Sequence, residues 1–129
     1  MLATLTDLAF DPAHRRLRYS CAWASYAAIL VLGSLPGARA DIGQLASGLV
    51  LHSLAYAIIT FGLLTGAGGP LQRRAVLAVL TVVAMGALDE YVQSYFPYRH
   101  AAVSDWLVDC GAAVLSALAQ LAWLPARAR

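Results

Sequence analysis

AVLAVLTVVAMGALDEYVQSYF, residues Ala75–Phe96, is the stretch that decides the fold class, because its first fourteen residues carry no charge. A helix needs about 20 apolar residues to cross the ~30 Å hydrocarbon core of a bilayer. Three other stretches qualify or nearly so, namely Tyr19–Leu35, Leu45–Gly66 and Ala102–Leu124. The sequence therefore predicts an all-α fold, an integral membrane bundle of four antiparallel transmembrane helices.

The composition of the whole chain supports this prediction. Of the 129 residues, 60% are hydrophobic and only 12% are charged, whereas about 25% are charged in an ordinary soluble domain. A soluble domain of this size has too little interior to bury so much apolar surface, so lipid is expected to cover much of it. The net charge is only +2, and no basic patch with aromatic residues points to nucleic acid.

Short connections rich in turn-forming residues separate the four predicted spans. They are residues 34–37, residues 66–70 and the region of Pro97, and Gly and Pro are the strongest local turn signals. Because each connection is short, consecutive helices are expected to be antiparallel neighbours. We interpret residues 1–129 as a single domain in which residues 1–14 form an interfacial lead-in.

The arginines determine the expected orientation, since the sequence contains no lysine. Arg39 and Arg99 lie on one side of the membrane in this topology. The other seven arginines lie on the opposite side: Arg15, Arg16, Arg18, Arg73, Arg74, Arg127 and Arg129. The positive-inside rule then predicts a multi-pass protein of the cytoplasmic (inner) membrane with both termini in the cytoplasm.

The first span has a competing interpretation as a signal peptide. Basic residues at 15–18, the apolar run after them and the Ala-Arg-Ala sequence at 38–40 resemble such a peptide with its cleavage site. However, the apolar run is long for that role, and Asp7 and Asp11 precede the basic cluster. Retention of the span is therefore favoured, and cleavage before Asp41 is the alternative.

Ionisable residues inside the spans crowd toward the outer end. Each costs about 2.5–3.5 kcal/mol near a helix centre, so such residues usually face the bundle interior and are functional by default. The ionisable residues within about two helical turns of the outer surface are His52, Glu90, Asp105 and Asp109. Residues four apart share a helix face, which places Tyr56 on the face of His52 and aligns Asp105 with Asp109.

These faces are expected to meet in one polar pocket between the second, third and fourth spans. Arg99 is the fixed cation of the short loop before the fourth span, so it can pair bidentately with Glu90 or Asp105. The candidate pocket residues are His52, Tyr56, Glu90, Gln93, Arg99, Asp105 and Asp109. The structural alternative is an interhelical hydrogen-bond network that only fastens the bundle.

Asp89 is left out of the predicted pocket. It points about 100° away from Glu90 on a helix, so we expect it to face Arg39 or the outer headgroups and to have no function. No metal or cofactor is predicted, because the sequence has no His-rich ligand pattern. No catalytic residue is predicted either, because no Ser or Cys nucleophile stands at a motif spacing from His52.

The ordered set of polar residues resembles the VanZ-like family of bacterial integral membrane proteins over nearly the whole chain. The residues that carry the resemblance are Ser34-Leu35-Pro36, His52-x-x-x-Tyr56, Glu90-x-x-Gln93, Arg99 and Asp105-x-x-x-Asp109. The chain departs from the family at Gly48 and Leu49, where an Asp-Lys pair is common, and at Asp109, where Asn is common. The resemblance implies a cell-envelope role linked to resistance to teicoplanin-type glycopeptide antibiotics.

Three functions are consistent with these residues. The leading hypothesis is a non-enzymatic envelope protein whose outer-facing pocket binds a lipid, a lipid-linked precursor or a lipoglycopeptide. In this hypothesis Arg99 meets an anionic group and the carboxylates meet hydroxyl or ammonium groups. The second is a membrane-embedded enzyme that acts on a lipid-linked substrate, with His52 in acid–base or metal chemistry. The third, a proton- or ion-coupled transporter component, is weaker because the inner halves of the spans are poor in polar residues.

Overall fold

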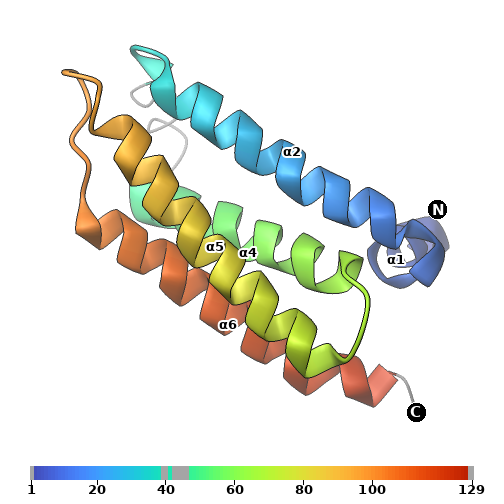
Figure 1. Cartoon of the computed structure of the whole chain (residues 1–129). Coiled ribbons are helices and arrows are strands. Elements are labelled where there is room, and N and C mark those ends of the chain that lie inside the picture. The colour runs from blue at the N-terminus through green and yellow to red at the C-terminus, as the bar shows by residue number, and fades with distance from the viewer. Residues whose placement is uncertain (1, 39–40, 42–46, 128–129) are drawn as a thin grey trace.

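The computed structural model describes residues 2–38, 41 and 47–127 of the chain. Its elements are the helices α1 (Leu2–Phe10), α2 (Arg15–Ser34), α4 (Gly48–Gly66), α5 (Leu71–Gln93) and α6 (Val103–Arg127), with a 3₁₀ turn at Pro12–His14 (Figure 1). All elements in the described part of the chain are therefore helical, as predicted. The predictions about Arg39, Arg129, the cleavage site after Ala40 and the start of the second span at Leu45 lie outside the described residues.

Three helices are long and apolar enough to cross a membrane: α4, α5 and the part of α6 from Val103 to Leu124. The boundaries of α5 differ from the prediction by about one turn at each end. The helix begins at Leu71, directly after Pro70, so its first turn includes Arg73 and Arg74. It ends at Gln93, because Pro97 disfavours helical backbone in the residue before it and cannot donate a helical hydrogen bond.

The helix α2 contains the first predicted span but has a shorter apolar part. Its first turn holds Arg15, Arg16 and Arg18, which leaves the uncharged stretch from Tyr19 to Ser34. The helix packs against both α4 and α5. The side chain of Tyr26 on α2 is buried, and its hydroxyl donates a 2.9 Å hydrogen bond to the carbonyl of Met85 on α5. The helix is thus an integral part of the packed bundle.

Two glycines allow α2 and α4 to approach closely at one end. A Cβ added at Gly66 would lie 2.7 Å from the backbone nitrogen of Tyr19 and 2.8 Å from the carbonyl oxygen of Arg15. At Gly62 it would lie 3.0 Å from the carbonyl oxygen of Arg18. Such backbone-to-backbone contact is possible only where the side chain is absent. This end of the bundle is therefore closed by direct contact of the two helices.

Arg18 fastens the same end with four hydrogen bonds. Its Nε donates to the hydroxyl of Thr65 at 3.1 Å, and its Nη2 donates to the Thr65 carbonyl at 3.0 Å. Its Nη1 donates to the carbonyls of Leu8 and Asp11, both at 2.9 Å. One side chain therefore joins the N-terminal segment and α2 to the last turn of α4.

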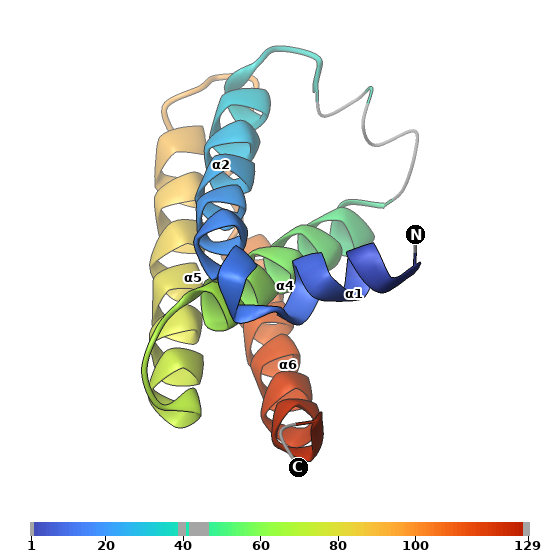
Figure 2. The same ribbon diagram turned by 90° about the vertical axis from the view of Figure 1, so that its right-hand side faces the viewer.

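At the other end α2 and α4 diverge, as both ribbon views show (Figures 1 and 2). There the end of α2 is held by the α5–α6 connection instead, since the hydroxyl of Tyr98 donates to the Ser34 carbonyl at 2.7 Å. The N-terminal half of α4 contacts α6, since the Nδ1 of His52 lies 2.8 Å from the Oδ1 of Asp109. The last turns of α2 and the first turns of α4 line a cavity at this end.

Candidate functional site

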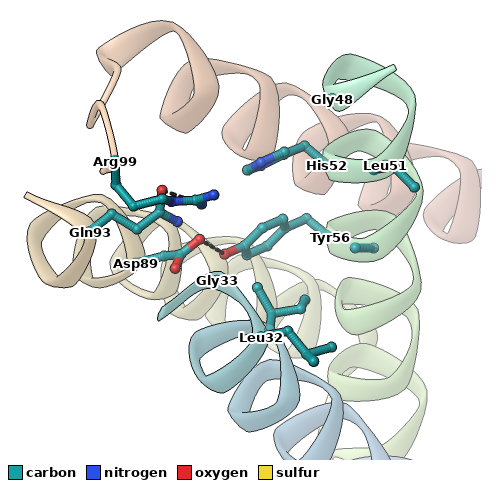
Figure 3. Close-up of a pocket in the computed structure, with 11 residues that line it drawn as sticks. Leu32, Gly33, Gly48, Leu51, His52, Tyr56, Asp89, Gln93 and Arg99 are labelled. Carbon is teal, nitrogen blue, oxygen red and sulfur yellow. Dashed lines mark hydrogen bonds between the residues drawn. The ribbon is translucent and has the colours of Figure 1, made fainter. Parts of the chain in front are cut away.

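A cavity of about 300 Å³ occupies the space between α2 and α4. Its volume is at the lower limit of typical ligand pockets. Apolar side chains from α2 and α4 line one part of it: Ile29, Leu32, Leu51 and Ala55. Polar side chains from α4, α5 and the loop after α5 line the other part: His52, Tyr56, Asp89, Gln93 and Arg99 (Figure 3). The backbones of Gly33 and Gly48 complete the wall.

A buried carboxylate lies at the polar end. Asp89 is 1% exposed, and its Oδ2 accepts a long hydrogen bond of 3.5 Å from the hydroxyl of Tyr56. Its other oxygen, Oδ1, has no hydrogen-bond partner within the described part of the chain. Buried polar atoms normally have a partner. Asp89 therefore presents an unused acceptor to the cavity.

Arg99 and Gln93 form the neighbouring wall. The Nη2 of Arg99 donates a 2.7 Å hydrogen bond to the Oε1 of Gln93, which fixes both side chains beside Asp89 (Figure 3). A Cβ placed on Gly33 would lie 3.6 Å from Gln93 Nε2, 3.7 Å from Asp89 Oδ1 and 3.8 Å from Arg99 Nη2. The three side chains thus approach the backbone of Gly33. Because Gly33 has no side chain, nothing from this residue fills the space between them and α2.

The imidazole of His52 is positioned by α6. Its Nδ1 is 2.8 Å from the Oδ1 of Asp109, which is 0% exposed. Its ring also stacks on the ring of Tyr56, with centroids 6.1 Å apart. Because Nδ1 is engaged, Nε2 is the ring nitrogen left for the cavity. Gly86 of α5 makes room for this pair, since a Cβ there would lie 3.0 Å from Asp109 Oδ2.

Four of the seven predicted pocket residues line the cavity: His52, Tyr56, Gln93 and Arg99. Asp109 does not line the cavity but contacts the Nδ1 of His52, which does. Glu90 has a different position, because its Oε2 accepts a 2.6 Å hydrogen bond from the backbone nitrogen of Ala102 and so fixes the α5–α6 connection. Asp105 is half-buried and does not line the cavity. The cavity lies between α2, α4 and α5, whereas the sequence predicted a pocket between α4, α5 and α6.

The predicted orientation of Asp89 was wrong, since this residue is buried and lines the cavity. The inward face of α5 runs through Val82, Met85, Gly86, Asp89 and Gln93. Gln93 is three residues from Glu90 and four from Asp89, so its spacing alone allowed either carboxylate to face inward. The apolar residues at 82 and 85 carried the missing signal, because Asp89 continues their stripe and Glu90 does not.

The described residues contain no group of three or more His, Cys, Asp or Glu side chains that could hold a metal ion. No family model, curated protein or solved structure matches the chain. The class of protein therefore follows from the fold and the cavity alone. The chain is a helical membrane protein, and the described part of it contains a cavity with one polar and one apolar side.

Proposed function

We propose that the protein binds an amphiphile in the cavity between α2 and α4. The observation that carries this proposal is the division of the cavity lining into a polar end and an apolar side. A headgroup fits against His52, Asp89 and Arg99, and an acyl chain fits along Ile29 and Leu51. A binding site of this kind matches each part of such a molecule with a surface of the same polarity.

The surroundings of the cavity suit entry from the bilayer. Large apolar side chains on the outer surfaces of the two helices next to the cavity are exposed: Val31, Leu49, Val50 and Leu54. In a membrane these side chains contact lipid tails. An acyl chain can therefore pass between α2 and α4 without crossing a polar surface, while its headgroup stays at the end where the helices diverge.

In this proposal α2 is a fourth transmembrane span, antiparallel to α4, and both termini are cytoplasmic. The hydrogen bonds of Arg18, Tyr26 and Tyr98 hold α2 in the bundle at its two ends and in its middle. The arginine-rich end, with Arg73 and Arg74 at the start of α5, then faces the cytoplasm. The cavity and Arg99 face the outer leaflet of the bacterial inner membrane.

The resemblance to the VanZ-like family belongs to the same proposal. Of the residues that carry it, His52, Tyr56, Gln93 and Arg99 line the cavity, and Asp109 holds His52. Motif residues gathered at one cavity are what a shared binding function requires. A role in the cell envelope, with membrane lipids, a lipid-linked precursor or a lipoglycopeptide as the ligand, follows from this resemblance.

The orientation can be tested with single cysteines in a variant that lacks Cys21 and Cys110. Ala101→Cys, in the exposed connection before α6, is expected to react with a membrane-impermeant maleimide in intact cells. Ala13→Cys, at the exposed N-terminal side of α2, is expected to react only after permeabilisation. The opposite labelling pattern would show that the cavity faces the cytoplasm.

Binding can be tested with a photoreactive amphiphile, a monoacylglycerol that carries a diazirine in its chain, added to vesicles that contain the protein. We expect crosslinks at Ile29 and Leu51. Ala55→Trp, which fills the cavity, is expected to reduce them about tenfold, the equivalent of losing about 1.4 kcal/mol of binding. Leu54→Trp is the matched control, because Leu54 is 58% exposed on the outside of the same helix. Equal crosslinking in both variants would refute binding in this cavity.

The geometry of His52 favours one alternative, a membrane-embedded enzyme. A histidine oriented by a buried carboxylate, with its second nitrogen toward a cavity, is the arrangement of a general base. Mass analysis of lipid extracted after incubation with the purified protein separates the two functions. Unaltered lipid indicates binding, whereas a hydrolysed or transferred acyl or headgroup indicates catalysis.

A further inference from the structure

The polar end of the cavity contains both donors and acceptors around one point, the missing side chain of Gly33. The amide nitrogen of Gln93, Oδ1 of Asp89 and Nη2 of Arg99 all lie within 4 Å of the position that a Cβ of Gly33 would occupy. A single small group bound near that point can therefore contact an amide donor, a guanidinium donor and a carboxylate acceptor together.

The hydrogen-bond roles of these atoms restrict the ligand group. An ionised Asp89 carboxylate can accept hydrogen bonds but cannot donate them. Gln93 Nε2 and Arg99 Nη2, in contrast, can donate but cannot accept. An ammonium group donates but cannot accept, and a phosphodiester accepts but cannot donate. A hydroxyl does both, so it can donate to Asp89 while it accepts from Gln93 or Arg99.

The charges of the lining restrict the ligand in the same direction. Asp89 and Arg99 are opposite charges on the same wall, and His52 is already paired with Asp109. A charged headgroup would add an uncompensated charge to a site of low dielectric, which is costly unless the charge is paired. An uncharged headgroup leaves the existing balance intact.

We propose that the cavity binds an amphiphile whose headgroup is uncharged and bears hydroxyl groups, such as a glycolipid, and that Asp89, Gln93 and Arg99 hold one hydroxyl beside Gly33. This assignment rests on the proposed amphiphile binding and specifies its headgroup. The unpartnered oxygen of Asp89, on a side chain that is 1% exposed, is the acceptor that this hydroxyl satisfies. The absence of a side chain at Gly33 leaves the room for it.

The test compares three lipids with identical acyl chains in nanodiscs: a monoglucosyl diacylglycerol, phosphatidylglycerol and phosphatidylethanolamine. Native mass spectrometry of the released protein measures which lipid is retained. We expect the glucosyl lipid to be retained about tenfold more than either phospholipid, which corresponds to about 1.4 kcal/mol. Equal retention of all three, or preference for a phospholipid, would overturn the headgroup assignment. Retention of none of the three would instead count against amphiphile binding itself.

Two variants locate the hydroxyl. Gly33→Ala places a methyl group at ordinary contact distance from the three polar atoms, so the protein should fold but lose the preference for the glucosyl lipid. Gly111→Ala is the matched control, because a Cβ there meets nothing within 4 Å. Asp89→Asn removes the negative charge beside Arg99, so it should shift retention toward phosphatidylglycerol. An unchanged lipid order in Gly33→Ala or in Asp89→Asn would refute the proposed position.

Discussion

Replacing Gly66 by alanine is expected to destabilise the protein by about 1–3 kcal/mol, the usual range for a side chain forced into a filled space. The new Cβ would lie 2.7 Å from the backbone nitrogen and 2.8 Å from the Cβ of Tyr19, and 2.8 Å from the carbonyl oxygen of Arg15. Two of these atoms belong to the backbone of α2, so no side-chain rotation relieves the clash. Unfolding by sodium dodecyl sulfate in mixed micelles measures the free energy.

Two further glycine variants make this experiment quantitative. Gly62→Ala should have a smaller effect, because its nearest contacts are 3.0 Å rather than 2.7 Å. Gly111→Ala should be neutral or stabilising, since alanine is favoured over glycine in a helix by up to about 1 kcal/mol. If Gly66→Ala were as stable as Gly111→Ala, the contact between α2 and the last turn of α4 would be disproved.

Replacing Asp109 by alanine is expected to be the most damaging change among the ionisable residues, at about 1–3 kcal/mol. Asp109 is 0% exposed and holds the Nδ1 of His52 at 2.8 Å. The substitution leaves that nitrogen without its partner and creates a void between α4, α5 and α6. The same detergent titration measures the loss.

Asp105→Ala is the matched control for Asp109→Ala, since it makes the same change one turn earlier on α6. Asp105 is only half-buried, so its replacement should cost less. A double-mutant cycle with His52→Ala then isolates the pair, because the second substitution should cost little once Asp109 is absent. Additive losses in that cycle would show that His52 and Asp109 do not interact.

The sequence predicted the helices well because a transmembrane span depends mainly on the length of an apolar run. The second predicted span and α4 end at the same residue, Gly66, where Gly and Pro follow. The errors at α5 are local. The error at the start of α5 arises because the predicted span begins only at Ala75, after Arg73 and Arg74, although the first turn of a membrane helix can carry charges at the interface.

The site was harder to predict because two acidic neighbours, Asp89 and Glu90, compete for the inward face of α5. Hydropathy does not distinguish them. The longer side chain of Glu90 reaches the backbone of Ala102, so it can be satisfied at the helix end, while Asp89 occupies the packed stripe. That outcome depends on the path of the α5–α6 connection, which the sequence pattern does not contain.

The contribution of α2 to the site was missed for a different reason. Its wall of the cavity consists of Ile29, Leu32 and Gly33, and none of them carries a polar group that marks a site in the sequence. The relevant property of Gly33 is that it has no side chain, which leaves volume in the cavity for a ligand. Motif reasoning detects chemical groups, whereas this part of the site is defined by shape.

The close contact of Gly62 and Gly66 with α2 fixes the angle between α2 and α4 at the end far from the cavity. From Gly62 back to Gly48 the helix α4 rises about 21 Å at 1.5 Å per residue. A tilt of about 5° at the glycine contact therefore displaces the far end of the helix by about 2 Å over that length. The width of the ligand that fits between the diverging ends of α2 and α4 is thus set by glycines at the opposite end, which do not contact the ligand.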